Sequence, residues 1–378
     1  MIQLGGLTAR QFLRRFWQKN PRLIARGSSR FKNFIDRRRA ITLASSRDVE
    51  SRLIIRSRGR WQVAHGPFKS SIFKTLPGKN WTLLIQGVNL HLAEADHLLR
   101  QFSFIPYSRM DDVMVSYAVP GGGVGPHFDS YDVFLLQGTG RRRWQIGRCQ
   151  DSTLVQNAPL KLLKNFAPEC EHVLETGDML YLPPYFAHHG TALDECVTYS
   201  IGCRAPTAQE LATQFLGYLH DELALEGGYR DPRLELAREP AAISDFALQE
   251  AARLLKEIKW TRGDIEKFFG RYLSEPKPNV FFNPPRAPLT GERFKSHCRK
   301  FGVSLDLKTQ MLYRGRTIFI NGERAPGQRI LFELANQRCL RSVRRIESRS
   351  SELLYSWYLA GYLHLNHERN TKRASYPR

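Results

Sequence analysis

The segment from Pro120 to Trp144 carries the residues best suited to chemistry. Within it, His127 and Asp129 are separated by a single phenylalanine. On a β-strand, residues two positions apart point to the same face, so an imidazole and a carboxylate would converge on one point. These are two of the three ligands in the facial triad that holds Fe(II) in non-haem oxygenases. The spacing therefore predicts a metal site that needs one further ligand.

A later part of the chain offers that third ligand. Residues 178–182 are predicted to form a strand that runs into Pro183-Pro184 and then reaches His188 and His189. A strand followed by a turn made rigid by proline would place one of these histidines at the mouth of a β-barrel. We prefer His188, the first of the pair, with His189 facing away or supporting the site. One histidine alone would favour an ordinary polar role, but the combination is much more specific for a metal site.

Three consecutive arginines precede Trp144. A facial triad leaves three metal positions open, and in an oxygenase these take a bidentate 2-oxo acid and then O₂. The far carboxylate of such an acid needs a fixed cation, for which arginine has the best geometry. Arg142 shares the strand parity of the apolar Trp144 and Ile146, which predicts that Arg142 points inward. Its two arginine neighbours would then form a basic surface.

Two further features flank the metal motif. The glycines between Gly121 and Gly125 are not followed by the Lys-Ser/Thr of a phosphate loop, so we expect a tight turn with close backbone approach. Asp111 and Asp112 are either surface acids or a carboxylate offered to a cationic substrate. Thr139 lies in a predicted hairpin turn and is a candidate for a hydroxyl that faces the site.

The surrounding pattern indicates how the chain positions these residues. Short strands separated by Gly/Pro turns, without repeating strand–helix units, argue for a mainly β core, an antiparallel barrel or jelly roll. We predict its strands at 81–88, 113–120, 132–137, 143–147, 178–182 and 197–203. This gives a first domain over 1–206, with its core at 90–206.

The rest of the chain is predicted to be different in kind. Residues 207–275 contain amphipathic helices at 207–225, 243–258 and 261–273, more apolar than short surface helices need, which indicates a dimerisation region. After a linker rich in Pro and Asn, residues 276–378 form a small basic α+β domain. Its short strands at 303–307, 310–313 and 317–320, with helices at 329–340 and 351–363, favour a winged-helix-like fold.

Composition narrows the setting of the protein. The chain has 378 residues, 42% of them hydrophobic, and a net charge of +21. Such a basic balance favours a polyanionic environment such as RNA or ribosomes, although a merely solvated basic surface is the alternative. The six cysteines contain no CxxC pair, and neither a secretory signal nor an apolar run long enough to span a membrane is found. We therefore expect a soluble cytoplasmic protein without a disulfide scaffold.

The metal motif and its surroundings resemble a known family. Residues 110–144, the segment GDMLYLPP at 177–184 and the segment YSIGCRAP at 199–206 resemble the bacterial JmjC-type ribosomal oxygenases. The resemblance implies a cupin, or double-stranded β-helix, enzyme that depends on Fe(II) and 2-oxoglutarate and forms homodimers. It implies 3-hydroxylation of an arginine side chain in the large-subunit ribosomal protein L-sixteen.

The resemblance also implies roles for particular residues. His127, Asp129 and His188 match the iron ligands. Arg142 matches the arginine that grips 2-oxoglutarate, with the hydroxyls of Thr139 and Ser116 as further cosubstrate contacts. The arginine-substrate pocket is matched by Asp112, Met114, Tyr131 and Ser200. These types suit the task, because a carboxylate pairs with a guanidinium, a thioether and an aromatic ring sandwich its flat face, and a hydroxyl accepts a hydrogen bond.

Two alternatives remain open at this stage. The first is a basic RNA- or ribosome-binding protein with a catalytically inactive cupin core, which need not hold iron. The second is a demethylase, or a hydroxylase of another residue such as histidine, which would share the triad and differ in the pocket.

Overall fold

The computed structural model describes residues 2–28, 31–232, 234–236, 238–342 and 347–367. The chain packs as two compact units. The first unit comprises residues 1–205, 276–309 and 328–378, and the second comprises residues 206–275 and 310–327. Within the described ranges, no helix has both the length and the apolarity to cross a bilayer.

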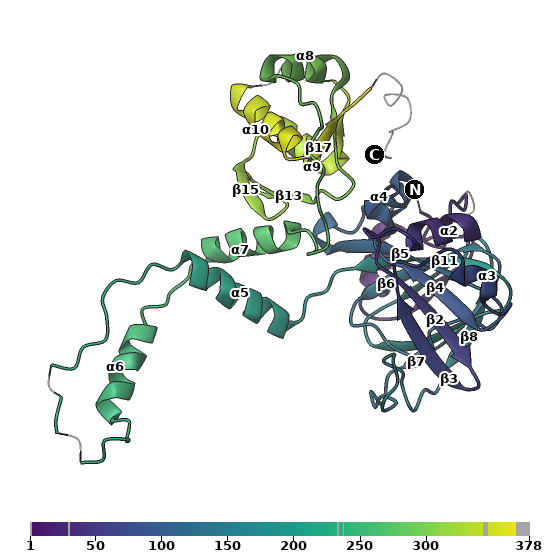
Figure 1. The fold of residues 1–378 in the computed structure, drawn as a ribbon, viewed down its shortest axis with the longest axis horizontal. Helices are drawn as coiled ribbons and strands as arrows, with labels where there is room; N and C mark the ends of the chain where they lie inside the picture. The colour runs from purple at the N-terminus through teal and green to yellow at the C-terminus, as the bar shows by residue number, and fades with distance from the viewer. Residues whose placement is uncertain (1, 29–30, 233, 237, 343–346, 368–378) are drawn as a thin grey trace. The chain divides into compact units, whose positions relative to one another are not determined.

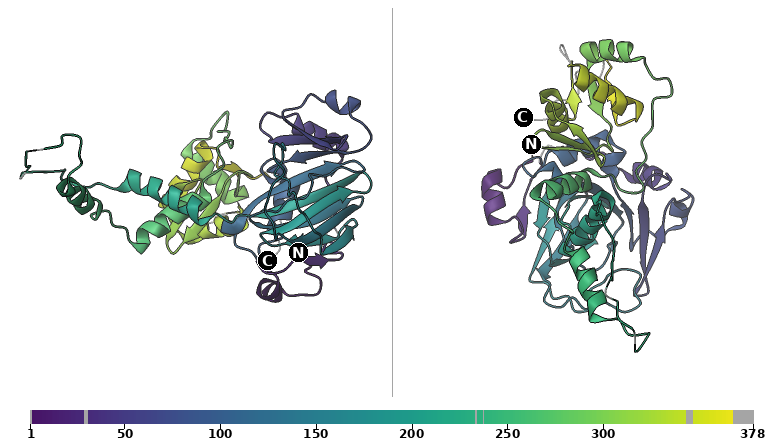
Figure 2. Two further views of the ribbon diagram at one scale, coloured as in Figure 1. Left: turned by 90° about the horizontal axis from the view of Figure 1, so that it is seen from below. Right: turned by 90° about the vertical axis from the view of Figure 1, so that its left-hand side faces the viewer.

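An antiparallel sheet of eight strands forms the larger half of the β core (Figures 1 and 2). In sheet order its strands are β1 (Arg22–Ile24), β9 (Met179–Leu182), β6 (Asp132–Thr139), β11 (Cys196–Cys203), β5 (Met110–Ala118), β4 (Trp81–Ile85), β2 (Ser51–Ser57) and β3 (Arg60–His65). Since the central strands are buried on both faces, they read as nearly continuous apolar runs rather than as clean alternations.

A second sheet of three strands completes the core. Its order is β10 (Phe186–Ala192), β7 (Arg142–Arg148) and β8 (Cys170–Leu174). The inward residues of both sheets meet in a shared apolar cluster that includes Val133, Leu135, Trp144 and Ile146. The prediction of a jelly roll is confirmed. The strands predicted at 113–120, 132–137, 143–147 and 197–203 correspond to β5, β6, β7 and β11.

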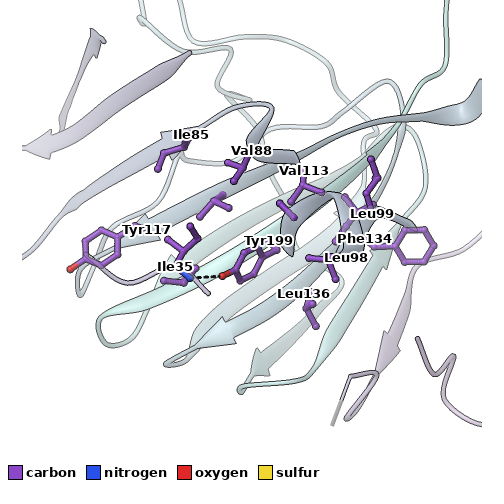
Figure 3. Close-up of a cluster of buried hydrophobic side chains, with 14 of the residues drawn as sticks. Ile35, Ile85, Val88, Leu98, Leu99, Val113, Tyr117, Phe134, Leu136 and Tyr199 are labelled. Carbon is purple, nitrogen blue, oxygen red and sulfur yellow. Dashed lines mark hydrogen bonds between the residues drawn. The ribbon is translucent and has the colours of Figure 1, made fainter. Parts of the chain in front are cut away.

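The outer face of the large sheet packs against helices and the N-terminal segment. The helices of this part are α1 (Ala9–Arg15), α2 (Arg37–Ala44), α3 (Ile72–Thr75) and α4 (Ala93–Arg100), with short 3₁₀ turns at Val88–Leu90 and Tyr107–Arg109. Figure 3 shows the cluster, in which Leu98 and Leu99 of α4 lie over Val113 and Phe134. The backbone N–H of Ile35 donates to the Tyr199 hydroxyl at 3.1 Å, which joins the N-terminal segment to the sheet.

The glycine cluster adopts the tight turn that the sequence predicts. Gly121 and Gly125 have φ angles of 77° and 79°, which glycine tolerates best. A Cβ atom on Gly123 would lie 2.3 Å from the carbonyl oxygen of Gly190, so only glycine allows the two backbones to approach this closely. The turn thereby holds the His127 segment against β10.

The second unit contains most of the predicted helical region. Its helices are α5 (Ala208–Glu222), α6 (Asp245–Leu255) and α7 (Arg262–Ser274), close to the three predicted ranges. The strands β13 (Met311–Arg314), β14 (Thr317–Ile320) and β15 (Glu323–Pro326) form an antiparallel sheet that contacts α7. Thr261 caps α7 in a reciprocal box with Asp264.

The remaining C-terminal elements belong to the first unit. They are α8 (Gly291–Phe301), α9 (Arg329–Gln337) and α10 (Ser348–Leu359), with a sheet in the order β16 (Cys339–Leu340), β12 (Val303–Leu305) and β17 (Leu363–Leu365). Several elements, among them α8, β8 and β10, were not predicted from the sequence. In particular, His188 and His189 were predicted to follow a proline turn at the barrel mouth, but they lie within a strand, residues 186–192, that pairs with β7.

Candidate active site

The structure brings His127, Asp129 and His188 together. One donor atom from each side chain lies within 4.8 Å of the others, which makes the group compact enough to hold a metal ion. The rings of His127 and His188 are 4.3 Å apart, and His188 Nε2 lies 3.8 Å from Asp129 Oδ2. Among the described residues this is the one such group of His, Cys, Asp and Glu side chains.

Backbone pairing explains why these side chains converge. The backbone N–H of His127 donates to the carbonyl of His188 at 3.0 Å, and the reverse bond measures 2.7 Å. The N–H of Tyr185 fixes the next position by donating to the carbonyl of Asp129 at 2.8 Å. The predicted strand at His127 is wrong in detail, because His127 forms an isolated bridge rather than part of a strand.

The two imidazoles are held in the tautomer that a metal needs. His127 Nδ1 lies 3.0 Å from the Gly125 carbonyl, and His188 Nδ1 lies 3.0 Å from the Phe186 carbonyl. Since a carbonyl only accepts, each Nδ1 carries the proton and each Nε2 keeps its lone pair. Burial, followed by the neighbouring His127, lowers the pKa of His188 to about 3, so its ring is neutral at physiological pH.

The carboxylate is supported differently. Burial raises the pKa of Asp129, while His127 and a hydrogen bond from Tyr131 oppose that rise. His189 stands on the opposite side of β10 from His188, and its Nε2 is 3.4 Å from the Thr191 hydroxyl. His189 lies outside the cluster of His127, Asp129 and His188, which agrees with the preference for His188 as the third ligand.

The arginine prediction made from strand parity is confirmed in its geometry. Arg142 is 4% exposed, whereas the side chains of Arg141 and Arg143 are 55% and 46% exposed. The two outer arginines pair with surface acids, Asp194 and Glu171 respectively. Only Arg142 is therefore available on the inner face of the core.

The surroundings of Arg142 fit an anionic ligand. Its two terminal nitrogens donate to the Ser116 hydroxyl at 3.2 and 3.1 Å, while its Nε has no partner. None of the carboxylates in the described part of the chain pairs with it. Because a buried cation without a counter-charge is costly, the side chain suits the far carboxylate of a 2-oxo diacid. Thr139 makes no described contact with Arg142, so Ser116 is the hydroxyl beside it.

Two buried polar residues near Arg142, Thr198 and Gln137, were not predicted from the sequence to belong to the site. Thr198 pairs in register with Ser116, and its hydroxyl donates to Gln137 Oε1 at 3.0 Å. Both interrupt apolar strands, which is the signal that would have revealed them. They add polar groups to the inner face beside Ser116.

The residues expected to bind a substrate side chain also gather on this inner face. Asp112 and Met114 share the face of β5 that carries Ser116, and Ser200 lies opposite Met114 in the register. Burial and then the charges of Asp129, Asp112 and Asp111 raise the pKa of Tyr131, which places its hydroxyl among these acids. The expected pocket residues and the triad thus belong to one region.

Asp112 is a buried acid with an oriented carboxylate. Its Oδ2 accepts from Gln86 Nε2 and from the Gly87 N–H, each at 3.1 Å. A side chain in place of Gly202 would bring a Cβ within 3.4 Å of the other oxygen, Oδ1. Burial raises the pKa of Asp112, and Lys277 opposes that rise. Gln86 and Lys277 were not expected at this site, because nothing in their local sequence links them to β5.

A jelly roll that gathers two imidazoles and a carboxylate beside a buried arginine has the ligand set of a non-haem, 2-oxo-acid-dependent oxygenase. In agreement, residues 97–211 match the family model for the JmjC domain, and residues 257–364 match that for the ROXA-like winged helix. The JmjC oxygenase with a C-terminal winged-helix domain is therefore the class of this protein.

Comparison with individual proteins defines the family more narrowly. The chain is 35% identical over 321 residues to the ribosomal protein uL16 3-hydroxylase of Escherichia coli, covering 83% of this chain and 84% of that protein. It is 36% identical over 257 residues to a probable ribosomal oxygenase of Haemophilus influenzae, covering 67% and 63%. The chain belongs to the JmjC ribosomal oxygenases.

A solved structure of that family shows the same architecture. The crystal structure of YcfD from Escherichia coli superposes with a TM-score of 0.85 at 32% identity, covering 97% of this chain and all of that one. A further YcfD structure, with a TM-score of 0.83, is a complex with cobalt and 2-oxoglutarate. The metal and the 2-oxo diacid of that relative are the two ligands that the triad and Arg142 fit.

Proposed function

We propose that this protein is an Fe(II)- and 2-oxoglutarate-dependent hydroxylase that acts on an arginine side chain of ribosomal protein uL16, the L-sixteen protein of the large subunit. The observation that supports this proposal most strongly is that the triad, the buried Arg142 and the oriented Asp112 occur together on the inner face of the core. The similarity to a uL16 3-hydroxylase supports the ribosomal target and the 3-position.

Each side chain has a distinct task in this proposal. His127, Asp129 and His188 hold the iron, and Tyr131 steadies the Asp129 carboxylate. With 2-oxoglutarate and O₂, the iron supplies the oxidation of an unactivated C–H bond. Arg142, with the Ser116 hydroxyl beside it, holds the far carboxylate of the cosubstrate.

The substrate side chain is held by the opposite end of the same face. Asp112 pairs with the guanidinium, and the Met114 and Tyr131 side chains cover its flat surfaces. Ser200 accepts one further hydrogen bond. These contacts fix which C–H bond faces the metal, because the guanidinium plane and the carboxylate set both the depth and the rotation of the side chain.

Mass spectrometry of uL16 from cells with and without this protein tests the proposal. We expect one arginine of uL16 to carry an additional oxygen atom only when the protein is present. Unmodified uL16 in both strains, or an oxygen on a histidine instead, would contradict it. Absence of iron from the purified protein would favour the alternative function, an RNA- or ribosome-binding protein with a catalytically inactive cupin core.

Substitution of Asp112 by asparagine should separate an arginine substrate from other substrates. The Gln86 and Gly87 donors will hold the amide oxygen, which turns the NH₂ group toward the incoming guanidinium. We expect the KM for an arginine-containing uL16 peptide to rise by about tenfold to a hundredfold, the cost of losing a charged hydrogen bond. Asp111→Asn is the matched control and should have a smaller effect, because Asp111 is partly exposed. An unchanged KM in Asp112→Asn would exclude this carboxylate as the arginine anchor.

The helical region supports a proposal about assembly. Large apolar side chains are exposed along the second unit at Leu216, Ile243, Phe246, Leu248, Leu255 and Phe269. Helix α6 has no buried residue at all, so its apolar side chains need a partner surface. We propose that residues 207–275 form a homodimer interface, within a division of the chain into domains at 1–206, 207–275 and 276–378.

Light scattering tests the dimer. We expect twice the 43.6 kDa chain mass for the wild type. Leu248→Asp should give the monomer mass, because it places a charge in the apolar interface. Val173→Asp alters another exposed apolar residue, on β8, and should leave the dimer intact. A monomeric wild type would contradict the proposal.

The charge of +21 supports a location among ribosomal components in the cytoplasm. Contact between the basic surface and ribosomal RNA would help to bring the enzyme to uL16, and such contact would weaken as the salt concentration rises.

A further inference from the structure

A lysine from the segment after α7 forms ion pairs with Asp111 and Asp112, the carboxylates of the proposed substrate pocket. Lys277 Nζ is 3.0 Å from Asp111 Oδ1 and 3.7 Å from Asp112 Oδ2. No other lysine or arginine in the described part of the chain forms an ion pair with Asp112. The ammonium therefore stands where the guanidinium of a substrate would bind.

The position of Lys277 is set by its neighbours. It lies between Pro276 and Pro278, which restrict the backbone on both sides. Burial lowers the pKa of Lys277, but Asp112, Asp111 and then Glu50 outweigh burial and raise it, so the side chain stays charged.

Lys277 has further acidic side chains near it besides Asp111 and Asp112. Lys277 also lines a cleft together with Glu50, Asp48 and Gln86. An ammonium displaced from Asp112 can turn toward Glu50 without losing an anionic partner. Its displacement by a substrate therefore costs little, and every cationic side chain that reaches Asp112 meets this same cost.

We propose that Lys277 is a self-occluding residue, whose ammonium occupies Asp111 and Asp112 in the free enzyme and is displaced when the guanidinium of the substrate binds. The inference rests on the proposed arginine hydroxylation. A substrate lysine would replace one ammonium with another and gain nothing. An arginine gains a bidentate bond to a carboxylate and stacking on Tyr131, neither of which an ammonium makes as well.

Peptide affinity tests this role without turnover. Full-length protein is loaded with Mn(II) and 2-oxoglutarate under nitrogen, and calorimetry measures binding of a uL16 peptide with its target arginine and of the same peptide with lysine. We expect Lys277→Met to tighten the arginine peptide by about three- to fivefold, since a modest ion pair no longer competes. The lysine peptide should gain by the same factor, because the cost of displacing Lys277 belongs to the free enzyme and is common to both peptides.

Two further variants make the result specific. Lys277→Arg should weaken both peptides, because a guanidinium competes better for the same acids. Lys259→Met, which removes an equal charge from an exposed site, should change neither affinity. Unchanged or weaker binding in Lys277→Met, or no binding by any form, would overturn the inference.

The proposed function is judged separately, from the oxygen added to the arginine peptide by the iron-loaded wild type in air. Product formation with no effect of Lys277→Met on affinity leaves the proposed function and removes the occluding role of Lys277. If the affinities change as predicted but no hydroxylated product forms, the role of Lys277 is kept and the proposed function is rejected.

Discussion

Replacing His188 with alanine should abolish hydroxylation and reduce metal affinity by at least about a hundredfold, more than the loss seen for residues that only support a ligand. The physical reason is that His188 supplies a neutral imidazole, held in one tautomer by the Phe186 carbonyl. The two remaining groups, His127 and Asp129, cannot define one face of an octahedron. Titration with Mn(II) and measurement of succinate formation are the readouts.

His189→Ala is the matched control for this prediction. It removes the adjacent imidazole, on the opposite side of the same strand, and should leave metal binding and turnover close to wild type. Full turnover in His188→Ala would show that another residue is the third ligand. A variant of His189 that loses metal would show that the wrong histidine has been assigned.

Replacing Arg142 with methionine should raise the KM for 2-oxoglutarate by about a hundredfold or more, as expected when a buried ion pair worth roughly 3–5 kcal/mol loses one partner. Methionine keeps much of the apolar volume beside Trp144 while removing the charge. Initial rates over a range of 2-oxoglutarate concentrations measure the effect. Arg143→Met, on the exposed side of the same strand, should leave this KM unchanged.

A stability measurement separates the loss of a ligand contact from a loss of folding. In the absence of 2-oxoglutarate, Arg142 is a buried cation whose described partners, the Ser116 hydroxyl and the Trp144 ring, carry no negative charge. Arg142→Met should then be at least as stable to heat as the wild type, because an uncompensated charge has been removed. Added 2-oxoglutarate should raise the Tm of the metal-loaded wild type and not that of the variant. A KM that does not change would exclude Arg142 as the cosubstrate anchor.

Local sequence patterns predicted the features that depend on a single strand or turn. The parity of Arg142 with Trp144 and Ile146 placed the arginine inside, since side chains alternate strictly along a strand. The turn at the glycine cluster was predictable because close backbone approach excludes a Cβ atom. The strand at His188 was not predictable, because Pro183-Pro184 dominates the local pattern and the pairing of β10 with β7 is a long-range contact.

The sequence by itself determined the chemistry: two histidines, one aspartate and an inward arginine suffice to indicate a metal and a 2-oxo acid. Residue types and strand parity carry that information, because both are local. Only the tertiary structure decided the partners of each group, such as the Gly125 and Phe186 carbonyls that set the imidazole tautomers. It also placed Lys277 on Asp111, although the two are far apart in the chain. Contacts of this kind depend on how distant segments pack, and no local pattern records that.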